Sequence, residues 1–177
     1  MNDIILHQPS NCTKFNRHPE IFKKATILKK EVKSILSFGC LTGEECYTLR
    51  KYFPESKIIG AEINKSLVKL CENKNSDKNI KFVHSEFENL KKHSPYDFIF
   101  AINVFNRDLK EPHKYPLYVF SYFEDQIIQF DGIIKATGIL VLVNSKHDFE
   151  KTNLFIKNRY SRCIQTGINK NFYQKIS

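Results

Sequence analysis

Two glycines enclose a short segment that has the form of a ligand-binding turn. The segment reads GCLTGEE from position 39 to position 45 and follows an apolar run. Glycines at this spacing permit a tight turn in which the backbone approaches a ligand closely. A dinucleotide fingerprint starting at Gly39 would need glycines in place of Leu41 and Glu44, and a phosphate-binding loop would need Lys and then Ser or Thr after Gly43. Two acids at the start of a helix would repel a phosphate and favour a ligand that carries positive charge.

An acid at the end of the next predicted strand supplies a second polar contact. Glu62 lies 19 residues beyond Gly43, a spacing at which a carboxylate can accept hydrogen bonds from both hydroxyls of a ribose. S-adenosylmethionine combines a ribose with a sulfonium and an ammonium group and has no phosphate. The two features together predict S-adenosylmethionine as the ligand and disfavour a nicotinamide cofactor. A helix-capping role for Glu62 is the alternative interpretation.

The elements that position these residues follow from hydrophobic periodicity. Helices are predicted over 20–33, 43–53, 65–73, 117–134 and 148–156, and strands over 34–38, 57–63, 80–84, 96–104, 139–144 and, more weakly, on either side of Gly167. Strands that alternate with helices are typical of βαβ units, in which helices cover both faces of a parallel sheet. The predicted fold class is therefore α/β and doubly wound, with the ligand at the carboxyl ends of the strands.

Several segments carry a family resemblance. Residues 35–49, ILSFGCLTGEECYTL, resemble the first motif of class I S-adenosylmethionine-dependent methyltransferases, and are most similar to the CheR-type methyltransferases, whose loop reads GCSTGEE. Residues 96–104 resemble that family's fourth strand, which leads into Asn-Val, and residues 13–22 are similar to its T-x-F-F-R segment. The strand at 138–143 fits the one that follows the usual proline-glycine turn. The resemblance covers about residues 13–144 and implies a Rossmann-like, mostly parallel seven-stranded sheet with a short N-terminal helix.

Carried over position by position, the resemblance implies a cofactor site on the first two strand ends. Gly39, Cys40 and Gly43 would line the methionine and ribose side of S-adenosylmethionine. Glu44 would lie near the methionine moiety, and Glu62 would hold the ribose.

The resemblance implies further contacts at the third and fourth strand ends. Ile63 would pack on the adenine, and Ser85 and Glu86 would face its amino group. Asn103 would lie beneath the methionine end or the transferring methyl group, and Arg17 matches an arginine beside the active site. A guanidinium there would suit a carboxylate acceptor through bidentate hydrogen bonds.

Some positions depart from the family pattern, and each candidate has a plainer interpretation. Leu41 replaces the loop's usual serine, and Asn16 replaces the second Phe of the T-x-F-F-R segment. The chain has almost nothing of the CheR helical N-terminal domain and no room for its small β-subdomain, so a protein-glutamate substrate is not implied. Arg17 could be an ordinary helix-start residue, Asn103 a satisfied core amide and Cys40 a small residue in a tight turn. His113, in the polar loop over 105–116, could be a base or a surface residue.

Length and charge bound the function further. The 177 residues fit one unit, with an N-terminal segment and helix over 1–34 covering the cofactor end and a methyltransferase-like domain over 35–177. Net charge is +9, and the excess lies in 1–35, with seven basic and three acidic residues, and in 146–177, with seven and two. The alternative function is therefore a non-catalytic module that uses the fold to bind nucleic acid or a protein partner through its basic ends.

Partners and location follow from what the sequence lacks. Apolar runs are too short to cross a bilayer, and the N-terminus has no secretory pattern. The five cysteines have no metal-type spacing, which predicts reduced thiols, a cytoplasmic protein and no metal. Methyl transfer by in-line displacement depends mainly on positioning, and the methyl acceptor and the oligomeric state are not specified by the sequence.

Overall fold

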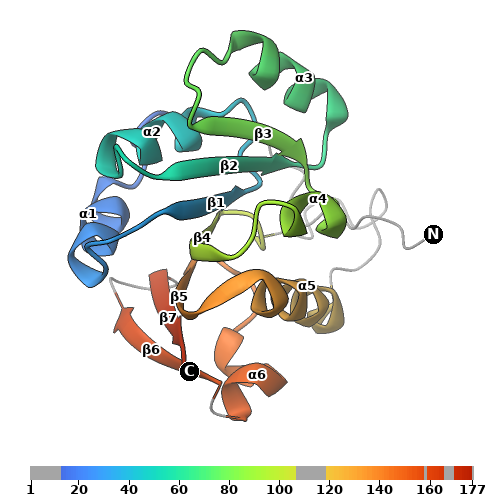
Figure 1. The fold of residues 1–177 in the computed structure, drawn as a ribbon. Coiled ribbons are helices and arrows are strands. Elements are labelled where there is room, and N and C mark those ends of the chain that lie inside the picture. Colours follow the sequence, from blue (N-terminus) through green and yellow to red (C-terminus); the bar gives the residue numbers. More distant parts are fainter. Residues whose placement is uncertain (1–12, 107–118, 158, 166–169, 177) are drawn as a thin grey trace.

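Seven strands form a single sheet in the computed structural model, which describes residues 13–106, 119–157, 159–165 and 170–176 (Figure 1). The strand order is β3-β2-β1-β4-β5-β7-β6. The first five strands are parallel, and β7 runs antiparallel to both β5 and β6. The bounds are β1 Ser34–Phe38, β2 Lys57–Glu62, β3 Ile80–His84, β4 Tyr96–Ile102, β5 Ile134–Val143, β6 Tyr160–Gln165 and β7 Lys170–Lys175. The mostly parallel seven-stranded α/β fold predicted from the sequence is confirmed.

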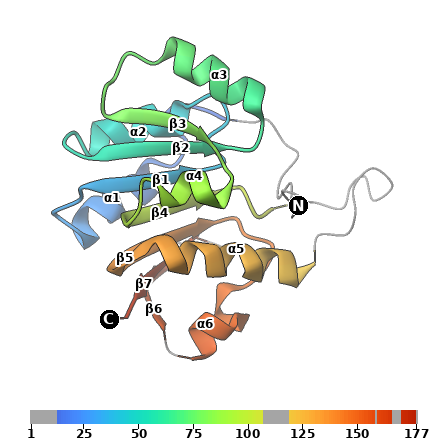
Figure 2. The same cartoon turned by 45° about the vertical axis from the view of Figure 1, so that its right-hand side comes forward.

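Helices cover both faces of the sheet, as a doubly wound fold requires. In Figure 2, α4 and α5 lie in front of the sheet and α1 and α2 behind it. One face carries α1 (Pro19–Leu28), α2 (Glu44–Tyr52) and α3 (Lys65–Lys74), and the other carries α4 (Phe87–Lys91), α5 (Phe120–Ile133), the 3-10 helix η1 (Phe149–Lys151) and α6 (Asn153–Ile156).

The central strand β4 separates two hydrophobic cores. All seven of its residues are buried, as its apolar sequence predicts. Phe98 and Phe100 belong to the core beneath α1 and α2, whereas Ile99 belongs to the core beneath α5. Each fully buried Phe contributes about 1.5–3 kcal/mol relative to an exposed one. This burial fixes the position of the loop that follows the strand, where the polar site residues begin.

The N-terminal helix is shorter than its apolar pattern predicts. It begins at Pro19 and ends at Leu28, whereas the pattern continues to 33. The cause is Asp97, buried at the start of β4, which accepts the N–H groups of Lys33 (2.8 Å) and Ser34 (3.1 Å) and pairs with Lys29 (3.0 Å). These contacts hold residues 29–34 in an extended path that leads directly into β1.

The connection from α5 to β5 also differs from the prediction. The sequence predicts a helix that ends at 134 and a strand that begins at 139, but β5 starts at Ile134, immediately after α5. Its register with β4 shifts between the pairs Tyr96–Ile134 and Phe98–Ile139. A bulge of this kind bends the strand, and Gly138 is required in it because a Cβ there would lie 2.5 Å from Cγ1 of Ile134.

Two smaller differences concern short helices. Helix α4 was not predicted, because its five residues carry too little periodicity for detection. The helix predicted over 148–156 is divided into η1 and α6 by Thr152, whose hydroxyl accepts the N–H of Phe155 and caps α6. Positions 117 and 118 of the predicted long helix lie outside the described residues.

Candidate functional site

The segment between β1 and α2 forms a tight, left-handed turn at the carboxyl edge of the sheet. Gly39 has a φ of +77° and Gly43 a φ of +92°, values that favour glycine. A Cβ at Gly39 would lie 2.7 Å from Cγ2 of Val104, and one at Gly43 would lie 2.9 Å from Cζ of Phe82. The turn therefore needs both glycines for backbone conformation and for space.

Glu62 lies directly against this turn. It is 5 % exposed, and its Oε2 accepts the N–H of Leu41 at 3.0 Å while Oε1 accepts the N–H of Asn64 at 2.9 Å. Asn64 caps α3 through its own side chain, which accepts the N–H groups of Ser66 and Leu67. Each carboxylate oxygen keeps a second acceptor position. The structure thus brings the acid at the end of β2 together with the glycine turn at the end of β1.

The two acids that start α2 have different environments. Oε2 of Glu44 accepts the hydroxyl of Thr42 at 2.6 Å. Oε1 of Glu45 accepts the hydroxyl of Ser37, a fully buried residue of β1, at 2.8 Å. Burial raises the pKa of Glu45 to about 8, against the lowering effect of the Ser37 hydrogen bond. Sequence reasoning gave Glu45 no role of its own, although its place in the GEE segment marked it as a neighbour of the site.

Cys40 packs beneath the turn with two other thiols. Cys40 is 2 % exposed, and its hydrogen bond with Cys46, together with burial, raises the pKa of its thiol well above the ordinary value. The thiol of Cys71 donates to the carbonyl of Leu41 at 3.3 Å. Thiols with raised pKa values are poor nucleophiles near neutral pH. This environment supports the interpretation of Cys40 as a small packing residue in a tight turn.

The residues expected around the adenine lie at the ends of β2 and β3. Ile63 is partly buried, and its carbonyl accepts a hydrogen bond from Nε2 of His84 at 2.8 Å. The N–H of Ser85 donates to the carbonyl of Glu62 at 3.0 Å, and the side chain of Glu86 is exposed. These contacts bring Ile63, Ser85 and Glu86 to the same edge as Glu62.

A chain of three polar side chains crosses the ends of β4 and β5. Asn103 follows β4 with a φ of +58°, and its Oδ1 accepts a hydrogen bond from Nδ2 of Asn144. Its own Nδ2 lies 3.2 Å from Nε2 of His18. Because Oδ1 is the acceptor, the amide nitrogen must donate, and Nε2 of His18 must accept.

His18 is therefore a neutral ring whose proton is on Nδ1. Nδ1 faces Oε1 of Glu20 at 3.8 Å. Burial lowers the pKa of His18, and it outweighs the opposite effect of Glu20. We name the set Asn144–Asn103–His18 the edge chain. Sequence reasoning missed His18 and Asn144; the available signal was that Asn144, like Asn103, directly follows an apolar parallel strand.

Arg17 is exposed and immediately precedes His18. The structure therefore places its backbone beside the edge chain, just before the N-cap of α1. Asn103 is only partly buried and both of its amide atoms have partners, so it is a satisfied amide at the edge of the sheet, not in its core. His113 and positions 107–116 of the predicted polar loop lie outside the described residues.

The fold and this edge define a Rossmann-like protein with the architecture of class I methyltransferases. Residues 29–176 match the family model described as "Methyltransferase domain". The chain belongs to this methyltransferase domain family.

Similar proteins of known name agree with the family. The malonyl-[acyl-carrier protein] O-methyltransferase of Bacillus cereus is 26 % identical over 117 residues, which are 59 % of this chain and 44 % of that protein. The plantazolicin methyltransferase BpumL, crystallised with a desmethyl-plantazolicin analogue and S-adenosylhomocysteine, has a TM-score of 0.56 at 19 % identity and covers 73 % of this chain and 47 % of its own. A methyltransferase from Geobacter sulfurreducens has a TM-score of 0.65 at 10 % identity, over 94 % and 81 % of the two chains. The chain spans about half the length of the first two of these relatives.

Two absences concern only the part of the chain that the structure describes. Within it, no helix is both long and apolar enough to cross a membrane. Within the same residues, no group of three or more His, Cys, Asp or Glu side chains has the arrangement of a metal site.

Proposed function

We propose that the protein transfers a methyl group from S-adenosylmethionine to a nucleophilic acceptor. The observation that carries the proposal is the buried carboxylate of Glu62 held against the glycine turn at the carboxyl ends of β1 and β2. Ligands of open α/β sheets bind at this edge. The family match and the neighbour crystallised with S-adenosylhomocysteine support the same cofactor.

Under this proposal, the cofactor lies along the strand ends from β3 to β4. Glu62 accepts the ribose hydroxyls with its remaining acceptor positions. The turn at Gly39, Cys40 and Gly43 admits the ribose and methionine to close approach, and Glu44 lies by the methionine end. The adenine side is formed by three residues already at that edge: Ile63, Ser85 and Glu86.

The acceptor side of the proposal is formed by Asn103 and Arg17. The bound cofactor supplies an electrophilic methyl group. Asn103 orients the reacting groups above β4, and Arg17 holds an acceptor carboxylate by charge-assisted hydrogen bonds. With the cofactor bound, transfer of its methyl group from sulfur to a carboxylate oxygen would yield a methyl ester and leave a neutral thioether. A carboxylate is already a nucleophile, so this reaction needs positioning and no general base.

A carboxylate acceptor has support from outside the site. The Bacillus cereus relative is named as an O-methyltransferase of malonyl-[acyl-carrier protein]. The closer assignment to the CheR type rests on the GCLTGEE turn and on Asn103 followed by Val104, and it is part of this proposal.

The alternative, a non-catalytic module that binds nucleic acid or a protein through its basic ends, has weaker support. Several basic side chains of those ends are already engaged within the fold. Lys29 pairs with Asp97 at 3.0 Å, and Arg159 and Lys175 both pair with Asp131, at 2.9 Å each. Charges paired in this way contribute less to a surface that attracts polyanions.

Calorimetric titration with S-adenosylhomocysteine tests the proposal. We expect Glu62→Ala to weaken binding by at least about tenfold, because it removes charge-assisted hydrogen bonds to the ribose. Glu72→Ala is the matched control, since Glu72 is exposed on α3. Thermal unfolding of each variant verifies that it is folded. If folded wild-type protein fails to bind S-adenosylhomocysteine, or if both variants bind as wild type does, the proposed cofactor site is wrong.

A further inference from the structure

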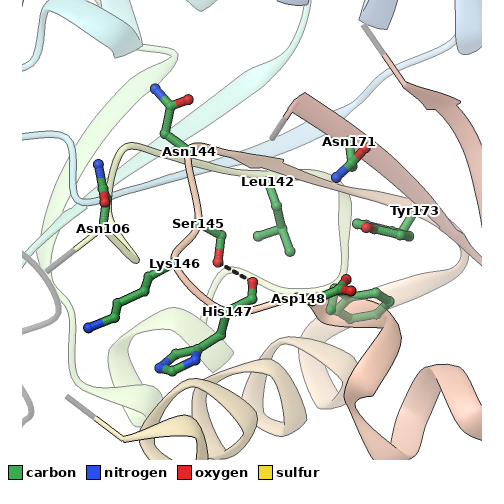
Figure 3. Close-up of a pocket in the computed structure, with 10 residues that line it drawn as sticks. Asn106, Leu142, Asn144, Ser145, Lys146, His147, Asp148, Asn171 and Tyr173 are labelled. Atoms are coloured by element: carbon green, nitrogen blue, oxygen red, sulfur yellow. Dashed lines mark hydrogen bonds between the residues drawn. The ribbon is translucent and has the colours of Figure 1, made fainter. Parts of the chain in front are cut away.

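A second feature of the carboxyl edge is a pocket beyond the end of β5, on the α5 side of the sheet (Figure 3). Its volume is about 360 Å³, which is within the range of small-molecule sites. Leu142 and Phe149 give it an apolar floor, and polar residues of the loop after β5 and of β7 form its walls. Asn144 belongs both to this pocket and to the edge chain. The pocket is therefore joined through Asn144 to Asn103, where methyl transfer is proposed.

Two residues of β7 offer hydrogen-bond donors to the pocket. Figure 3 shows the amide nitrogen of Asn171 and the hydroxyl of Tyr173 directed toward the pocket from β7. Burial raises the pKa of Tyr173 far above its ordinary value, and nearby Glu150 and Asp148 raise it further, against the lowering effects of Arg162 and of a hydrogen bond with Asn171. The phenol therefore keeps its proton and can donate. The ammonium group of Lys146 adds a positive charge at the exposed side of the pocket.

One acid also lines the pocket and limits the charge that it can accept. Asp148 accepts the N–H of Glu150 at 3.0 Å and caps η1. Lys146 supplies a positive charge near the pocket and Asp148 a negative one. The two negative charges of a phosphate dianion would therefore not be neutralised. A single carboxylate would receive the amide N–H of Asn171 and the phenol O–H of Tyr173, and Lys146 would add positive charge at the exposed side of the pocket.

The fold also brings the two basic ends of the sequence to this edge. Arg17 comes from the first end, and Lys146 and Lys170 come from the second. Lys170 begins β7 and binds Oε1 of Glu20 at 2.7 Å, which ties β7 to the first turn of α1. Positive groups therefore occur on both sides of the edge chain, with Arg17 on one side and Lys146 on the other.

We propose that this pocket binds a second carboxylate of the methyl acceptor, so that the acceptor is a small dicarboxylic acid or its half ester. One carboxylate would lie over Asn103 beside Arg17, and the other would enter the pocket and bind Asn171 and Tyr173, with Lys146 at the exposed side. The inference rests on the proposed function for the identity of the reaction. The binding preference itself can be measured without methyl transfer.

Binding of two matched probes, glutarate and pentanoate, tests the inference. The two acids have the same number of carbons, but only glutarate has a carboxylate at both ends. We expect glutarate to bind at least about tenfold more tightly, because its second carboxylate adds charge-assisted hydrogen bonds. Amide chemical shifts should change at residues 144–148 and 171–173 with glutarate and much less with pentanoate.

Variants then locate the preference. Asn171→Leu and Lys146→Gln should each reduce the advantage of glutarate by about three- to tenfold. Gln174→Leu, an exposed amide on the same strand, should leave it unchanged. Lys146 is exposed, so its variant remains informative even if Asn171→Leu fails to fold. Equal binding of the two acids, no binding of either, or an advantage untouched by both pocket variants would overturn the inference.

The outcome is separable from that of the proposed function. The probes are titrated with and without S-adenosylhomocysteine. If the protein prefers glutarate but does not bind S-adenosylhomocysteine, the dicarboxylate pocket is supported and the proposed methyltransferase function is wrong. If the protein binds S-adenosylhomocysteine but binds the two acids equally, the proposed methyltransferase function is supported and the dicarboxylate pocket is wrong.

Discussion

At the scale of single residues, two acids near the carboxyl edge have different hydrogen-bond partners. Glu62 is buried, and its two carboxylate oxygens accept the backbone N–H groups of Leu41 and Asn64. Glu45 receives only one hydroxyl, from Ser37, and the pKa of its carboxyl is raised to about 8 by burial. An acid of the second kind costs stability whenever it is ionised.

Glu45 should therefore make stability depend on pH. Its pKa in the folded state lies above the ordinary value of 4.5. The contribution of the protonated Glu45 carboxyl to the free energy of unfolding is thus fully present below about pH 4.5 and is lost as pH rises toward 8. Glu45→Gln keeps an acceptor for Ser37 and removes the charge, so we expect it to be about 2–4 kcal/mol more stable than wild type at pH 8, with little difference at pH 5. Urea unfolding at pH 5, 6.5 and 8 measures this.

The control for this comparison is Glu72→Gln, on the exposed side of α3. It should leave the pH dependence of the free energy of unfolding as it is in wild type. A Glu45→Gln protein whose stability follows the wild-type pH curve would show that Glu45 is ionised in the folded protein without cost.

At the scale of elements, two glycines with different surroundings allow a matched comparison. Gly39 has a left-handed φ of +77°, and a Cβ would lie 2.7 Å from Val104. Gly132 lies in α5, where a Cβ would meet only Phe87 among the described residues, at 3.9 Å. The first glycine is required by the turn, whereas the second only weakens a helix.

Alanine should therefore have opposite effects at these positions. Gly39→Ala should lower the free energy of unfolding by about 1–3 kcal/mol and abolish binding of S-adenosylhomocysteine, because the turn must move. Gly132→Ala should raise it by about 0.4–1 kcal/mol and leave binding intact. Chemical unfolding and calorimetry on both variants measure the two effects. Normal cofactor binding by Gly39→Ala would mean that the turn does not contact the ligand.

Elements bounded by local signals could be predicted from the sequence, and those bounded by distant contacts could not. Asn64 caps α3 through its own side chain, so the start of that helix was predictable. The end of α1 depends on Asp97, more than 60 residues away. The glycine turn and Glu62 belonged to adjacent strand ends and could be brought together by fold rules alone. His18 meets Asn103 across 85 positions, a separation at which spacing carries no information.

At the scale of the whole molecule, the remaining question is where the positive charge acts. The net charge of +9 is the basis of the polyanion alternative. Ion pairs to Asp97, Asp131, Glu20 and Glu150 engage part of the charge of both basic ends within the fold. Of the same two ends, Arg17 directly precedes His18 and Lys146 follows shortly after Asn144, so they lie next to opposite ends of the edge chain. We infer that the charge serves an anionic acceptor at this edge more than an extended polymer.

Ligand-induced stabilisation distinguishes the two functions in one experiment. A ligand that binds the folded state at one hundred times its dissociation constant adds about 2.7 kcal/mol to stability. For a chain of this length, that corresponds to a rise in Tm of about 5–10 °C. We expect this rise with S-adenosylhomocysteine at both low and high salt, because the proposed contacts are buried. Heparin should stabilise the protein weakly, and only at low salt, since such binding depends on counterion release. A large, salt-sensitive rise with heparin and none with S-adenosylhomocysteine would identify the protein as a polyanion-binding module built on a methyltransferase fold.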